Sequence, residues 1–217
     1  MEFLNCQFSL FNKMLETLSA FIFATAILAI SPGPDNIFVL TQSIVNGRKY
    51  GIATILGLMT GCLVHTTFVA FGYSTLIEQQ PFLFMGIKIF GANYLLYLAY
   101  QVYKSDAKIT FSTEHVLQKT TVELFKKGFL MNVLNPKVTL FFLAFFPQFL
   151  FSEQLSHLVQ FYVLGMLFIF VSFLIFGAIA ILGGQISDTI SKRKNIGWYL
   201  KWGQIVVFVF ISIFIIL

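Results

Sequence analysis

Charged residues are scarce in this chain: Asp, Glu, Lys and Arg make up only 11% of its 217 residues, while 58% are hydrophobic. The apolar residues fall in runs long enough to cross the roughly 30 Å hydrocarbon core of a bilayer. The alternation typical of a transmembrane β-barrel is absent, and lipid requires each crossing to satisfy its own backbone groups. We therefore expect an all-α integral membrane protein.

Cysteine is also rare, since Cys6 and Cys62 are the only two and form neither a CxxC motif nor a disulfide framework. No apolar run contains a Ser-His pair or the two-histidine spacing of a metal site. We expect no metal, no cofactor and no enzymatic activity. The net charge of +5 does not indicate nucleic-acid binding, because the basic residues lie mainly at the ends of apolar runs.

Six apolar runs predict six transmembrane helices. No cleavage site follows the first run, so we expect no cleaved signal peptide. Residues 1–13 are mixed in character and read as an N-terminal leader, and 14–217 as a single transmembrane domain. The expected spans cover 14–45, 51–77, 82–103, 128–151, 157–183 and 195–217.

Basic residues alternate between the loops. Arg48 and Lys49 follow the first span, several lysines lie in or beside the connector at 104–127, and 192–194 are all basic. The second and fourth loops contain no Lys or Arg. By the positive-inside rule, both termini lie outside the cytoplasm and the 104–127 connector inside it.

Prolines interrupt the first and fourth spans. A straight helix over 14–45 would be about 48 Å long, which is too long for the bilayer core. Pro32 and Pro34 supply a break in this span, and Pro136 supplies one in the fourth.

The two halves of the chain, about 14–103 and 128–217, look related. Pro32 precedes Gly61 by the same separation as Pro136 precedes Gly165, and each half has three spans. Three spans reverse the orientation of the second half, which predicts a 3+3 inverted repeat.

Each break carries one charge, Asp35 in the first and Lys137 in the second. A charge at the bilayer centre costs roughly 3 kcal/mol on insertion scales, so it must pair, meet freed backbone groups or face a hydrated cavity. The free amides and carbonyls of broken helices suit a zwitterion. We expect Asp35 to hold an ammonium group and Lys137 a carboxylate. Alternatively, Asp35 simply caps the second half of its helix.

Three asparagines flank the breaks: Asn36, Asn132 and Asn135. They either satisfy backbone groups freed by the prolines or help to form a hydrated binding site. His65 is the one histidine deep inside an apolar run, and with Asp35 it is a candidate proton relay. A histidine hydrogen-bonded to a neighbouring helix is the alternative. Gly57 and Gly61 have the GxxxG spacing of closely packed helices.

Three segments resemble the LysE/RhtB family of amino-acid exporters: SPGPDN at 31–36, NGRKYGIATILGLMTG at 46–61 and GFLMNVLNPKVTLFFLAFFPQF at 128–149. The resemblance implies a bacterial inner-membrane carrier, dimeric, that expels threonine, homoserine or related compounds against a proton gradient. The family's motif residues fall on Pro32, Gly33, Pro34, Asp35, Asn36, Asn135, Pro136 and Lys137.

These observations predict a secondary exporter that alternates access around the two breaks. Its expected partners are an amino-acid substrate, the lipid bilayer and protons. A membrane thiol-disulfide redox protein of similar plan is one alternative, although such proteins place cysteines beside the repeated prolines. A channel is the other.

Overall fold

The computed structural model describes residues 2–31, 33–73, 80–105, 120–183 and 196–216. Within these ranges every regular element is helical, as expected for a chain that must satisfy its backbone groups in lipid. In chain order the elements are α1 (Glu2–Ile30), α2 (Pro34–Val45), α3 (Arg48–Gly72), α4 (Pro81–Lys104), α5 (Thr121–Val133), α6 (Pro136–Leu140), the π-helix η2 (Phe141–Phe145), the 3₁₀-helix η3 (Phe146–Phe149), α7 (His157–Ile181) and α9 (Ile196–Ile216).

Five of these helices are long and apolar enough to cross a membrane, and a bent pair raises the number to six. The pair joins 121–133 to 136–149 with a bend of 49°. These findings confirm the prediction of a multi-pass, all-helical membrane protein. The 3+3 inverted repeat stays a prediction. So does the division at residue 13, although residues 2–13 continue into the rest of α1 as one helix.

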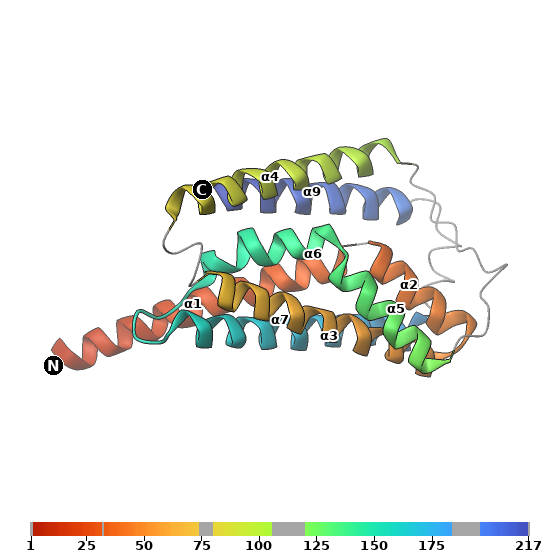
Figure 1. The fold of residues 1–217 in the computed structure, drawn as a ribbon, viewed down its shortest axis with the longest axis horizontal. Helices are drawn as coiled ribbons and strands as arrows, with labels where there is room; N and C mark the ends of the chain where they lie inside the picture. The colour runs from red at the N-terminus through yellow and green to blue at the C-terminus, as the bar shows by residue number, and fades with distance from the viewer. Residues whose placement is uncertain (1, 32, 74–79, 106–119, 184–195, 217) are drawn as a thin grey trace.

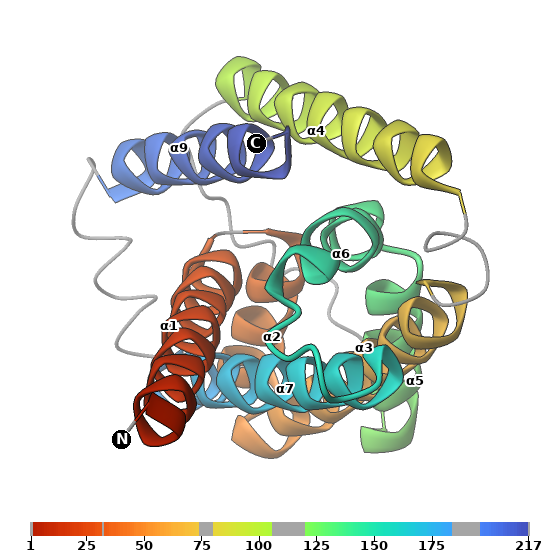
Figure 2. The ribbon, with the colours of Figure 1, turned by 90° about the vertical axis from the view of Figure 1, so that its left-hand side faces the viewer.

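The helices form two groups (Figures 1 and 2). α4 and α9 pack against each other along one side of the molecule. In the other group α3 contacts α2, α5 and α7, and α1 packs against α7. The two chain ends point toward the same end of the molecule, and the N-terminal part of α1 extends beyond the other helices (Figure 1).

Glycines bring α3 and α5 into direct backbone contact. A Cβ on Gly57 would lie 2.0 Å from the Phe125 carbonyl oxygen, and one on Gly128 would lie 2.3 Å from that of Thr54. A Cβ on Gly61 would lie 2.6 Å from Asn132 Oδ1. The Gly57–Gly61 spacing therefore does predict a close helix approach, and the contact lies within one chain.

Apart from α1, which begins at Glu2 rather than 14, two helices start clearly before their predicted spans. α3 begins at Arg48 rather than 51, directly after Gly47, whose φ of 99° favours glycine. α5 begins at Thr121 rather than 128, because Thr120 and Glu123 form a reciprocal capping box. The hydrophobic pattern misses both starts, since charged first turns belong to the helix but not to its apolar run.

Two prolines shape the segment after the second break. Pro136 is the first residue of α6, where its missing amide costs nothing. Pro147 cannot donate to the carbonyl four residues earlier, and here the chain changes from the π-helix η2 to the 3₁₀-helix η3. Phe141, Phe142, Phe145 and Phe146 from this segment are fully buried and form much of the core.

Candidate functional site

The chain has two helix interruptions, one between α1 and α2 and one between α5 and α6. The side chain of Asn135 connects them. Its side-chain amide Nδ2 donates to Asp35 Oδ2 over 2.9 Å, which links the start of α6 to the start of α2. Its Oδ1 accepts from the backbone N–H of Lys137 over 3.0 Å, so Asn135 is also the N-cap of α6. One side chain thus fixes the position of both charged segments.

Asp35 is the second residue of α2, after Pro34, and is half-buried. The N-cap of this helix is Gly33, in an extended conformation, and no side chain caps the helix. The capping alternative for Asp35 is therefore wrong. Its negative charge still favours the helix N-terminus. Oδ1 of Asp35 is buried and finds no hydrogen-bond partner in the described ranges, so this oxygen is available to a ligand.

Lys137 reaches from α6 toward the other interruption. Its Nζ lies 5.3 Å from the centre of the Phe208 ring on α9, a cation–π contact. The same atom would lie 3.7 Å from a Cβ on Gly33. Among the described residues, Lys137 and Asp35 form no direct ion pair, and their charges attract across a shared cavity.

The other two predicted asparagines have different surroundings. Asn36 Nδ2 donates to the Ala29 carbonyl over 2.8 Å, so it satisfies a backbone group at the end of α1. Asn132 is 4% exposed, and its Nδ2 donates to Cys62 Sγ over 3.4 Å. Oδ1 of Asn132 has no hydrogen-bond partner among the described residues. Asn36 therefore joins two helix ends, whereas Asn132 keeps a free acceptor.

His65 lies beside this site on α3. Its Nε2 is 3.2 Å from the backbone carbonyl of Asn132, so this nitrogen is the donor. The ring packs against Phe142 at a centroid distance of 5.4 Å. His65 is hydrogen-bonded to a neighbouring helix, as the alternative expected, and does not line the cavity. Its role as a proton relay stays a prediction.

A small cavity of about 40 Å³ lies between the two interruptions. This volume suits water and is well below the roughly 300 Å³ of a typical small-molecule pocket. Polar and charged side chains from α2, α5, α6 and α7 share it with apolar ones. The lining residues are Leu28, Ala29, Asp35, Asn36, Met59, Cys62, Asn132, Lys137, Val138, Phe168, Ser172 and Phe176.

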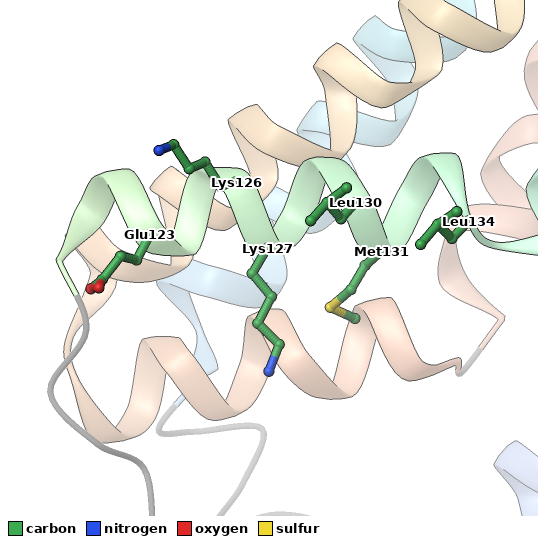
Figure 3. Close-up of a pocket in the computed structure, with 6 residues that line it drawn as sticks. All are labelled: Glu123, Lys126, Lys127, Leu130, Met131 and Leu134. Carbon is green, nitrogen blue, oxygen red and sulfur yellow. The ribbon is translucent and has the colours of Figure 1, made fainter.

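Larger cavities exist elsewhere in the described part of the chain. One of 590 Å³ runs along α5 (Figure 3) and is lined by Glu123, Lys126, Lys127, Leu130, Met131 and Leu134. Glu123 belongs to the capping box, and Lys127 Nζ lies 4.6 Å from the Phe38 ring. Another, of 740 Å³, lies between α4 and α5–α6 and has an uncharged lining. Neither lies between the two interruptions.

The structure brings together five of the nine predicted binding residues: Asp35, Asn36, Asn132 and Lys137 line the cavity, and Asn135 links Asp35 to the backbone of Lys137. Gly33, Pro34 and Pro136 shape the backbone beside it. Pro32 lies outside the described residues.

Sequence reasoning missed four contributors: Ser172, Phe168 and Phe176, which line the cavity, and Phe208, which contacts Lys137. A lone serine in the apolar run at 157–183 was a usable signal. The phenylalanines were not, because 28 are spread through the chain.

Comparison with known proteins identifies the family of this chain. A profile of the LysE type translocator family matches residues 26–217. The chain belongs to this family. It is 33% identical over 178 residues to the homoserine/homoserine lactone efflux protein of Salmonella typhimurium, with 81% of this chain and 84% of that protein covered. The Salmonella typhi protein of the same name matches equally.

An uncharacterized membrane protein of Vibrio cholerae is 29% identical over 182 residues, with 81% and 87% of the two chains covered. No solved structure matches the chain. Members of the LysE family are transporters, so this protein is a membrane transporter and not an enzyme. The resemblance seen in its motifs is confirmed, and the thiol-disulfide redox alternative is set aside.

Proposed function

We propose that this transporter is a secondary exporter of amino acids or close derivatives, homoserine-like in size. It would act by proton antiport with alternating access across the bacterial inner membrane. One observation carries the proposal: Asp35 and Lys137, of opposite charge, line the same cavity from two different helix interruptions. The names of the Salmonella relatives support the substrate class.

The charge pair suits a zwitterionic solute. The free oxygen of Asp35 would accept hydrogen bonds from a substrate ammonium group, and Lys137 would attract its carboxylate. Among the described residues, Asp35 and Lys137 are the only charged ones that line the cavity, and the rest of its wall is largely apolar. A substrate with a basic side chain would therefore find no second carboxylate in this lining. The lining favours substrates with small neutral side chains.

Cavity size supports alternating access. At about 40 Å³ the space is too small for an amino acid, so the helices around it must separate to admit one. Asn135 would respond to substrate binding, because its two hydrogen bonds go to Asp35 and to the backbone N–H of Lys137, and the substrate would contact both of these residues. Separation toward one side of the membrane at a time gives carrier behaviour.

Proton coupling would use the same carboxylate. If Asp35 is protonated while the substrate is absent and ionised while it is bound, export is linked to proton entry. We propose His65, one hydrogen bond from Asn132, as the candidate through which the proton reaches the cavity. A substitution of His65 by Gln would then uncouple export from the pH gradient without removing substrate binding.

Charge placement supports an orientation with both termini outside. The α2–α3 turn, the end of α4 and the start of α5 lie at the end of the molecule opposite the termini (Figure 1). These segments carry Arg48, Lys49, Lys104, Lys126 and Lys127. The expected homodimer stays a prediction.

The test is export by an Asp35→Asn variant. Cells loaded with homoserine and inverted membrane vesicles should both lose export, while the variant still inserts into the membrane. Glu153→Gln is the matched control, since it removes an exposed carboxylate outside the cavity. Normal efflux by the Asp35 variant would remove this residue from the mechanism. Flux at channel rates through the wild type in bilayers would replace the carrier by a channel.

A further inference from the structure

Around the central cavity, three buried oxygen atoms have no hydrogen-bond partner within the part of the chain that the structure describes. They are Asp35 Oδ1 on α2, Asn132 Oδ1 on α5 and Ser172 Oγ on α7. All three residues line the cavity between the interruptions. Asn132 is 4% exposed and Ser172 is 1% exposed, so neither is open to the surrounding lipid. Three separate helices thus each contribute one residue with a free oxygen to the lining of a single small cavity.

Ser172 shares its lack of a partner among the described residues with two other buried hydroxyl residues, Thr25 and Ser31, but of the three only Ser172 lines the cavity. Ser43, Thr54 and Thr66 each donate to the carbonyl four residues earlier, the usual way in which a helix satisfies a buried hydroxyl. Ser172 makes no such bond, although it lies in the middle of α7. Its hydroxyl therefore stays free for a group in the cavity.

Buried polar groups without a hydrogen-bond partner destabilise a folded protein. Three in a single cavity would be an unusual loss unless a ligand satisfies them together. Two of the oxygens, the carboxylate and the amide oxygen, only accept hydrogen bonds. A hydroxyl oxygen accepts as well as donates. The complementary ligand group is compact, positively charged and rich in donors.

We infer that Asp35 Oδ1, Asn132 Oδ1 and Ser172 Oγ form the subsite that binds the primary ammonium group of the substrate. This inference rests on the proposed export of amino acids. A primary ammonium has three N–H donors, one for each oxygen, and its charge offsets that of Asp35. Ser172 is thereby a specificity-determining residue, because it recognises the third donor.

Lys137 does not occupy this subsite. Its Nζ lies over the Phe208 ring and beside Gly33, and it forms no direct ion pair with Asp35 among the described residues. The lysine is thus left to bind the substrate carboxylate while the three oxygens bind the amine. Substrate orientation follows from this division, with the amine toward α5 and α7.

The test compares two probes, homoserine and its N-trimethyl derivative, in inverted vesicles that contain wild-type protein or the Ser172→Ala variant. A hydrogen bond to a charged group contributes about 1.5–3 kcal/mol, so we expect the variant to raise the KM for homoserine at least about tenfold. The KM for the N-trimethyl probe, which has no N–H donor, should change little. Ser212→Ala is the matched control, because Ser212 is equally buried but donates to the Ala92 carbonyl away from the cavity.

Each outcome separates this inference from the proposed function. No export of homoserine by the wild type would contradict the proposed function. Wild-type export with an unchanged KM in the Ser172 variant would overturn only the ammonium subsite. An equal rise in KM for both probes would do the same, because the serine would then act on packing. A changed requirement for sodium would assign the oxygens to a metal cation instead.

Discussion

Asn135 is the connection between the two charged segments, and its removal offers a quantitative test. Asn135→Ser keeps a good N-cap for α6 but is too short to reach Asp35. Asn135→Ala removes both interactions. The hydrogen bond to the carboxylate should contribute about 1.5–3 kcal/mol and the cap about 1 kcal/mol. The serine variant should therefore lose only the first amount, and the alanine variant both.

A double-mutant cycle isolates the pair. Asp35→Ala, Asn135→Ser and the combined variant are compared with the wild type by unfolding of the purified protein in detergent. The coupling energy between the two positions should be about 1.5–3 kcal/mol. Additive effects, with a coupling near zero, would refute the reasoning that Asn135 holds the two interruptions together. Equal losses in the serine and alanine variants would refute the separate role of the cap.

Three further predictions follow from particular contacts. Gly57→Ala should destabilise the protein by about 3 kcal/mol or more, because its new methyl group meets a backbone carbonyl of α5. The control, Gly72→Ala, should be near neutral, since a Cβ there meets nothing within 4 Å. Thermal unfolding in detergent compares the two variants. Phe208→Leu should weaken substrate affinity up to about tenfold by freeing Lys137 from its aromatic contact, as a binding titration with homoserine measures. Gly47→Ala should cost about 1 kcal/mol of stability through its positive φ and leave transport per folded molecule unchanged.

Each of these three predictions would be contradicted by a particular result. A stable Gly57 variant would mean that α3 and α5 can separate freely. Unchanged affinity after loss of the aromatic ring would show that Phe208 only fills space. A Gly47 variant as stable as the wild type would mean that the turn before α3 adopts another conformation at no cost.

The sequence by itself determined the class of protein and the two charged positions. Long apolar runs require helices in lipid, whatever their packing, so the membrane-spanning elements could be counted before any contact was known. Asp35 and Lys137 stood out for a similar reason, since a charge beside a proline is costly in an apolar run. The SPGPDN and NPK segments indicated the family.

Tertiary structure alone decided how these parts meet. Local patterns cannot show that Asn135 bonds to Asp35, which lies a hundred positions away. Nor do they show that Phe208 covers Lys137, or that Ser172 faces the cavity rather than its own helix. Such contacts depend on which faces of separate helices pack together, and glycines such as Gly57 set that packing through side-chain volume rather than through any chemical motif.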